Sequence, residues 1–252
     1  MSSAELSLLV GLILAHLSGD FLLQPRAWVE ERYRLRHRSP RLAQHALLHG
    51  LLAGGVLLVA VATGPATRGP AAILAGALAV AGSHWLIDLA KARLPPQQLR
   101  WFLLDQALHL LVLLGVWLAW LGTPAPLTEA LHWFVEPQVL GVATTYLLVT
   151  RPLSIAIALV MQRWSSEIHD PGTLAEAGAR IGMLERFLVL TLVLLDQLTA
   201  VGFLLAAKSV LRFGDLRESR DRKLTEYVLL GTLLSVASTL VIGLTLRLLL
   251  AP

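Results

Sequence analysis

The sequence contains no cysteine and little charge for its length. Without cysteine the 252-residue chain offers no disulfide, no thiolate metal site and no cysteine nucleophile. Charged residues make up only 15% of it, whereas 56% is hydrophobic and the mean hydropathy is +0.67. A water-soluble domain of this size needs more polar surface than that. The composition therefore excludes an ordinary soluble globular protein and predicts an integral membrane protein.

The positive charge that is present does not indicate a nucleic-acid partner. The formal net charge is +4 and the pI is about 10, but the basic residues gather in short segments beside apolar runs. That distribution is typical of the positive-inside pattern of membrane proteins. The sequence has no nucleic-acid motif, so we expect membrane lipids as partners and no nucleic acid.

Apolar runs long enough to cross about 30 Å of hydrocarbon recur along the chain. Helix is expected for all of them, because lipid leaves no water to satisfy open backbone groups. This predicts an all-α, polytopic membrane bundle, with a four-span region at 1–121 and a C-terminal region at 122–252. The six full spans expected are Glu5–Gln24, Leu42–Thr63, Ala71–Leu94, Leu99–Leu121, Ile181–Ala207 and Tyr227–Leu250.

The basic connectors predict the orientation. The arginine-rich connector after the first span is expected in the cytoplasm, which places the N-terminus outside. The six basic residues within Lys208–Lys223 then face outward if Val139–Trp164 crosses fully. Arg151–Pro152 lies in that segment, and proline disfavours helix in the residue before it. We therefore expect 139–164 to be a broken or re-entrant element.

The connector Arg26–Ser39 is expected to be an interfacial amphipathic helix. In this interpretation Trp28 and Tyr33 lie at headgroup level, and the arginines contact anionic lipid. A simple topology-setting run of charges explains the same residues equally well.

Each of the first four spans contains a pair of ionisable residues four positions apart. A spacing of four places both members on one helix face, and ionisable groups in lipid normally face the bundle interior. Histidine precedes aspartate in the first and third spans, whereas aspartate comes first in the fourth. This reversal aligns the pairs in antiparallel helices and predicts a histidine layer over an aspartate-rich layer. The pairs are His16 and Asp20, His45 and His49, His84 and Asp88, and Asp105 and His109.

These eight side chains are candidate metal ligands. Imidazole nitrogen with carboxylate oxygen is the ligand set of zinc, manganese or non-haem iron. Eight ligands exceed the needs of one ion, so either two ions bind or some aspartates orient histidines. Asp20, Asp88 and Asp105 are also the candidate general bases. A metal-free proton pathway and purely structural pairing are the alternatives, whereas the aspartates argue against a haem.

Other polar residues in the spans are weaker candidates for a functional role. Gln24 continues the stripe of His16 and Asp20, whereas Gln106 is expected to point about 100° away from Asp105. Lys91 is interpreted as a snorkelling interfacial charge. In the second half, Glu185–Arg186 and Asp196–Gln197 are interpreted as polar ties between helices, although Asp196 lies deep in its expected span. No role is predicted for His132 or His169.

Four short motifs together resemble a known family. HLSGDFLLQ, QHALLHG, SHWLIDLAK and FLLDQALHLL are similar to a bacterial membrane family catalogued as domain of unknown function 3307. The resemblance covers roughly residues 10–115, and the stretch IGMLERFLVL…GFLLAAKSVLRFGDL looks like the C-terminal region of longer members. It implies a multi-pass protein of the bacterial cytoplasmic membrane and no particular activity.

Our functional hypothesis is an intramembrane metal-dependent hydrolase. It would act near the cytoplasmic leaflet on a lipid, lipid-linked or membrane-embedded substrate, with the histidines as ligands and an aspartate as general base. A metal-ion or proton transporter would use the same residues as a relay. A non-catalytic scaffold with a structural metal is the third alternative.

Overall fold

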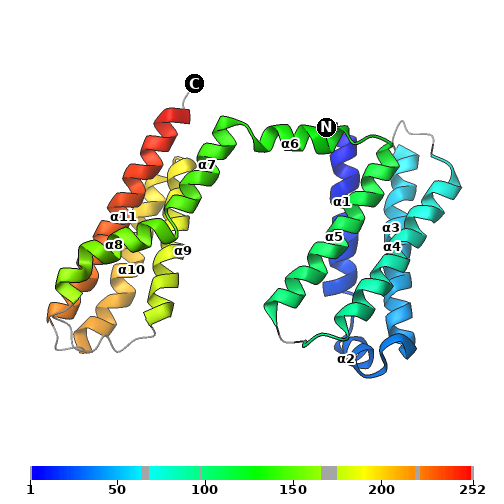
Figure 1. The fold of residues 1–252 in the computed structure, drawn as a ribbon, viewed down its shortest axis with the longest axis horizontal. Helices are drawn as coiled ribbons and strands as arrows, with labels where there is room; N and C mark the ends of the chain where they lie inside the picture. The colour runs from blue at the N-terminus through cyan, green and yellow to red at the C-terminus, as the bar shows by residue number, and fades with distance from the viewer. Residues whose placement is uncertain (1, 64–67, 97, 166–174, 219–221, 251–252) are drawn as a thin grey trace. The chain divides into compact units, whose positions relative to one another are not determined.

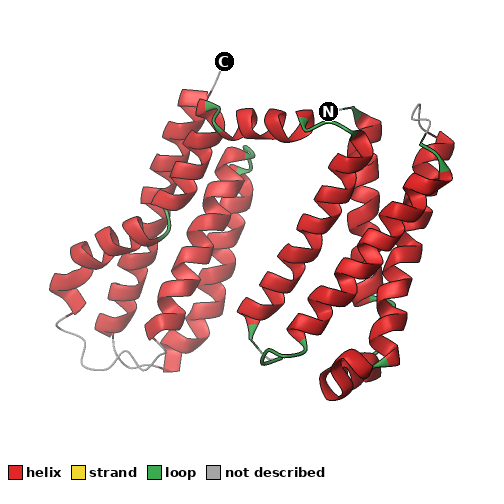
Figure 2. Cartoon of the chain, turned by 45° about the vertical axis from the view of Figure 1, so that its right-hand side comes forward, coloured by secondary structure: helices red, strands yellow, loops and turns green. Residues whose placement is uncertain are grey.

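The computed structural model describes residues 2–63, 68–96, 98–165, 175–218 and 222–250, which contain helices and no strand (Figures 1 and 2). Six helical segments are long and apolar enough to cross a membrane. The all-α, multi-pass membrane fold expected from the sequence is confirmed. The chain divides into two compact units, Met1–Ala130 and Leu131–Pro252.

Unit 1 is a bundle of four long helices with a short helix at one end (Figure 1). Its short elements, α2 and the 3-10 helix η1, connect α1 to α3, and we call the end where they lie the α2 end. The elements are α1 (Ser3–Phe21), α2 (Arg26–Leu35), η1 (Arg36–Arg38), α3 (Pro40–Thr63), α4 (Pro70–Lys91), α5 (Leu99–Leu121) and the start of α6 (Ala125–Phe134).

Local chemistry sets the helix ends of unit 1. Ser2 and Glu5 form a capping box at the start of α1, each side chain accepting a hydrogen bond from the other's backbone N–H. Pro70 opens α4, where the backbone donor it lacks has no helical partner in any case. Gly122 ends α5 in the left-handed conformation, at φ 72°.

Close contact between α3 and α4 holds the bundle together. A Cβ atom at Gly50 would lie 2.9 Å from the carbonyl oxygen of Ala77, so only glycine permits this approach. Away from the α2 end the interior is entirely hydrophobic among the buried residues described. These residues are Leu8, Leu12, Ala53, Leu57, Val80, Leu113, Trp117 and Trp120.

Unit 2 contains the remaining helices, and two of them form a hairpin. The helix α9 packs against α11 and turns sharply into α10, which runs back antiparallel to it (Figure 1). Asp196 sits in that turn with φ 61°. The elements are α7 (Pro137–Leu148), α8 (Arg151–Ser165), α9 (Ala175–Leu194), α10 (Leu198–Glu218) and α11 (Arg222–Leu250).

The prediction of one span over Ile181–Ala207 is wrong. The apolar run continues through this segment, but the chain reverses direction at Asp196. With this extra reversal, the basic residues of Lys208–Lys223 are expected on the cytoplasmic side even though 139–164 crosses fully. The ends of α8 and α10 and the starts of α9 and α11 lie at one end of unit 2 (Figures 1 and 2). Part of Lys208–Lys223, at 219–221, lies outside the described residues.

The predicted break within 139–164 is confirmed. The helices α7 and α8 are separated at Val149–Thr150, directly before Arg151–Pro152. The segment does not re-enter, however, because α7 begins at one end of unit 2 and α8 finishes at the other (Figure 1). With the hairpin in place, no re-entrant element is needed to explain the distribution of charge.

Candidate metal centre

The eight ionisable residues predicted from the four spans converge inside unit 1. They come from α1, α3, α4 and α5, within about three turns of the α2 end. Seven of them are at most 3% exposed, and Asp20 is half-buried. The set is His16, Asp20, His45, His49, His84, Asp88, Asp105 and His109, and we call it the His/Asp cluster.

The five histidine rings of the cluster touch one another. His49 and His84 stack with ring centroids 3.7 Å apart, and His109 lies 4.1 Å beyond His84. The ring of His16 is 5.0 Å from that of His109, and His45 is 4.6 Å from His49. His16, His49, His84 and His109 thus form the histidine layer expected from the i, i+4 spacing on four antiparallel helices, and His45, expected in the aspartate-rich layer, also contacts it.

Asp20 is the hub of the cluster. Its Oδ1 atom lies 3.2 Å from Nε2 of His45, 3.1 Å from Nε2 of His49 and 3.6 Å from Nε2 of His84. A carboxylate oxygen has two lone pairs, so three imidazoles cannot all donate good hydrogen bonds to it. The other oxygen, Oδ2, lies 3.6 Å from Nε2 of His16.

The other two aspartates each contact a cation. Asp88 forms an ion pair with Arg32 of α2, and its Oδ2 also lies 3.7 Å from Nε2 of His84. Oδ2 of Asp105 accepts a hydrogen bond of 2.5 Å from Nζ of Lys91. The α2 end of the cluster is therefore lined by both signs of charge.

Sequence reasoning missed Arg32. The arginines of α2 were expected on lipid headgroups, but Arg32 is 4% exposed and points at the cluster, one turn after Trp28. Trp28 is half-buried, with its ring 6.4 Å from that of His45. The i, i+4 spacing of Trp28 and Arg32 was the available signal, because it places both on one face of α2.

The interpretations of Lys91 and Gln106 also need correction. Lys91 does not simply snorkel, because its ammonium contacts Asp105. Gln106 does not point away, since its Nε2 donates to Oδ2 of Asp20 at 2.9 Å and to Oδ2 of Asp105 at 3.3 Å. A long amide side chain can turn back across the 100° between neighbouring helical positions.

Three overlapping groups within the cluster bring ligand atoms within 4.8 Å of one another. They are His16 with Asp20, His49 and His84; His45 with His84 and Asp88; and Asp20 with Asp105 and His109. Ligand atoms around a tetrahedral zinc ion are about 3.4 Å apart, given bonds of about 2.1 Å. The nitrogen-to-oxygen distances of 3.1–3.9 Å fall around that value.

Several buried polar atoms of the cluster have no hydrogen-bond partner in the described part of the chain. They include Nε2 of His16, His49 and His84, both ring nitrogens of His109, and Oδ1 of Asp105. Each buried unpaired polar atom costs about 1–3 kcal/mol. A bound cation with nitrogen and oxygen ligands would satisfy them together, so the residues fit a metal ion.

The sequence of the chain matches one known protein family. The model of the family described as Protein of unknown function (DUF3307) matches residues 8–136, which is more than half of the sequence. The chain belongs to the DUF3307 family. The matched residues include all of the His/Asp cluster together with Arg32, Lys91 and Gln106. No curated protein and no solved structure matches the chain.

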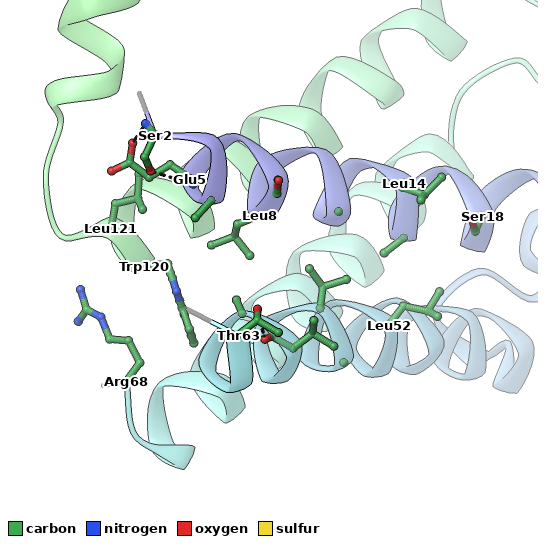
Figure 3. Close-up of a pocket in the computed structure, with 18 residues that line it drawn as sticks. Ser2, Glu5, Leu8, Leu14, Ser18, Leu52, Thr63, Arg68, Trp120 and Leu121 are labelled. Atoms are coloured by element: carbon green, nitrogen blue, oxygen red, sulfur yellow. Dashed lines mark hydrogen bonds between the residues drawn. The ribbon is translucent and has the colours of Figure 1, made fainter. Parts of the chain in front are cut away.

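A large groove of unit 1 is separate from the cluster. It has a volume of about 940 Å³ and runs along α1 and α3, from Glu5 and Arg68 at one end to Ser18 and Leu52 at the other (Figure 3). Its lining is mostly apolar and includes no residue of the cluster. The groove lies on a different face of α1 from His16 and Asp20.

Several charged residues of unit 2, beyond the DUF3307 match, tie helices together. Nε of Arg186 donates to the carbonyl oxygen of Val149 at 2.6 Å, where α7 ends. Lys208 donates to Glu185 at 2.5 Å, which joins α10 to α9. Asp196, expected deep in a span, is exposed at the hairpin turn and pairs with Arg247. His132 is exposed, and His169 lies outside the described residues.

Proposed function

We propose that the His/Asp cluster binds one or two divalent metal ions and that the protein is an intramembrane metal-dependent hydrolase. The observation that supports this most is the convergence of three imidazole Nε2 atoms on one oxygen of Asp20, at 3.1–3.6 Å. Zinc, manganese or iron suits the mixed nitrogen and oxygen ligands.

The ligand groups share members, which suits two neighbouring ions. Asp20 and His84 each belong to two of the three groups. In two-metal hydrolases the ions polarise the substrate and lower the pKa of a bound water. An aspartate that does not bind the metal through both oxygens would accept the proton of that water.

An enzyme fits the interior of unit 1 better than a transporter. A transporter needs a polar path from the cluster to the far side of the membrane. Between the cluster and the opposite end of the bundle, the buried residues described are Leu, Ala, Val and Trp. This interior favours access to the cluster from the α2 end.

We further propose the bacterial cytoplasmic membrane as the location, with the N-terminus outside and the α2 end in the cytoplasm. The arginines of the α2 connector support this orientation. A substrate would then approach from the cytoplasmic leaflet, as a lipid, a lipid-linked molecule or a membrane-embedded segment. Asp20 and Lys91 are the half-buried members of the site on that side.

Metal analysis of the purified protein tests the proposal. Wild type, prepared in detergent without chelator, should carry one or two equivalents of a transition metal. A His84→Ala/Asp88→Ala double variant should lose most of it, whereas the exposed His132→Ala should not. Wild type without stoichiometric metal, even after incubation with zinc or manganese, would overturn the proposal.

A further inference from the structure

Arg32 brings unused hydrogen-bond donors to the cluster. It is 4% exposed, and its Nη1 pairs with Asp88. The Nε atom of the same guanidinium is buried and has no hydrogen-bond partner in the described part of the chain. A guanidinium presents its N–H groups as a planar fork that matches two oxygens of a carboxylate or phosphate. Arg32 therefore has a donor available for another oxyanion.

Lys91 brings a second cation to the same end. Its side chain is 19% exposed, its Nζ lies 2.5 Å from Oδ2 of Asp105, and it lies 5.7 Å from the centre of the Phe102 ring. An ammonium has three donors, so the bond to Asp105 leaves two. Arg32 and Lys91 thus contact two different aspartates at the α2 end of the cluster, where Lys91 is the more exposed of the two cations.

The charge of the site calls for an anion when metal is bound. The three aspartates carry three negative charges, whereas Arg32, Lys91 and one divalent ion together carry four positive charges. A second ion widens this excess to three. Uncompensated charge in the membrane interior is costly, so an anionic ligand beside the metal stabilises the site.

We propose that Arg32 and Lys91 bind a phosphate group, so that the substrate of the site is a phosphate ester. This inference rests on the proposed function, because it names the substrate class of that same site. The planar fork of Arg32 suits two oxygens of the phosphate, and Lys91 at the rim meets the anion as it enters. The ester is either a membrane lipid or a soluble molecule, which share this chemistry.

Calorimetric titration of the full-length, metal-loaded protein with inorganic phosphate tests the inference. Arg32→Gln is expected to weaken phosphate binding tenfold or more, and Arg32→Lys, which keeps the charge and loses the fork, by less. Arg34→Gln is the matched control, because Arg34 is exposed on the same helix and its loss removes the same charge. Lys91→Gln should weaken binding several-fold.

Short-chain phosphatidic acid forms the second arm of the experiment. Tighter binding of this lipid than of phosphate assigns the group to a lipid headgroup, and equal binding assigns it to a soluble ester. Either result supports the inference when both depend on Arg32. Metal content and size-exclusion profile, measured for every variant, separate loss of the site from loss of the fold.

The outcomes distinguish this inference from the function beneath it. Wild type that holds metal but binds neither ligand overturns the phosphate assignment and leaves the metal site intact. The phosphate assignment is also overturned if Arg34→Gln weakens phosphate binding as much as Arg32→Gln and Lys91→Gln do. Wild type without metal that still binds phosphate through Arg32 overturns the metal site alone. If Arg32→Gln does not fold, Arg32→Lys and Lys91→Gln take its place in the test. Phosphate binding as tight as wild type in both of these variants would overturn the inference.

Discussion

The imidazole rings of His49 on α3 and His84 on α4 stack with their planes 16° from parallel. The same two rings direct their Nε2 atoms at one oxygen of Asp20, from 3.1 and 3.6 Å. Two stacked imidazoles cannot both carry a positive charge at this separation without strong repulsion. The pair therefore suits neutral rings, and neutral imidazole is the form that binds a metal.

Asp20→Asn should remove most of the bound metal. The substitution keeps the shape of the side chain but removes the negative charge and replaces one oxygen with a donor, which would face His16 or His45. Because Asp20 belongs to two ligand groups, the metal affinity should fall by more than the roughly 10–100-fold lost with a residue that only orients a ligand. Elemental analysis and competition with a chelator measure the loss. The exposed Asp196→Asn is the control, and equal metal in both variants would contradict the role of Asp20.

Gly19→Ala should disturb the cluster without changing any ionisable residue. A Cβ at this position would lie 2.5 Å from Nε2 of His49, and that ring has little room to move because it stacks on His84. The expected result is lower metal affinity and a lower melting temperature. Gly82→Ala is the control, because nothing lies within 4 Å of its Cβ position. Equal behaviour of the two variants would mean that His49 is free to shift.

Gln106→Leu should weaken metal binding about tenfold while leaving every proposed ligand in place. The amide of Gln106 donates to both Asp20 and Asp105, and such supporting hydrogen bonds are worth about 10–100-fold in affinity. Gln44→Leu, at an exposed position on α3, serves as the control. A chelator titration of the two variants makes the comparison. Unchanged affinity in Gln106→Leu would show that the amide does not orient the aspartates.

Arg186→Met should destabilise unit 2 and spare the metal site. The substitution leaves the buried carbonyl of Val149 without its donor at the end of α7, and about 1–3 kcal/mol is expected for that group alone. Thermal unfolding should show a lower transition temperature, with metal content unchanged because the cluster lies in unit 1. Arg151→Met is the exposed control. A loss of metal in Arg186→Met would contradict the independence of the metal site in unit 1 from the packing of unit 2.

Reporter fusions should detect the reversal of the chain at Asp196. A fusion after Gln197 should read as external, and fusions after Trp164 and Lys223 should both read as cytoplasmic, because α9 and α10 form a hairpin. A single span over 181–207 would instead place Trp164 and Lys223 on opposite sides. That pattern would contradict the hairpin of α9 and α10.

The His/Asp cluster could be predicted from the sequence because two strong rules act together. Helix is required in lipid, so an i, i+4 pair shares one face, and the cost of exposing charge to acyl chains turns that face inward. Four such pairs on consecutive antiparallel helices then meet at one depth. His16, His49, His84 and His109 follow from these rules alone.

Arg32, Lys91 and the hairpin could not be predicted in the same way. An arginine-rich connector is explained by topology alone, so nothing local marks Arg32 as the one that folds back onto Asp88. The turn at Asp196 interrupts a run with neither proline nor glycine at the reversal. Asp196 has a left-handed φ and pairs with Arg247, 51 positions later, which is a contact that the local sequence does not reveal. Asp196–Gln197 was one of two charged interruptions in that run, with Glu185–Arg186, and both were interpreted as ties between helices.

Asp20 and His84 each belong to more than one ligand group, so the groups are not independent binding sites. When the first ion binds a shared side chain, fewer ligand atoms remain for the second ion, and those that remain have changed position. A metal titration should therefore deviate from identical, non-interacting steps, and the occupancy of the pair should depend on the order in which different metals are added. Selectivity would then be a property of the pair of ions and not of either one.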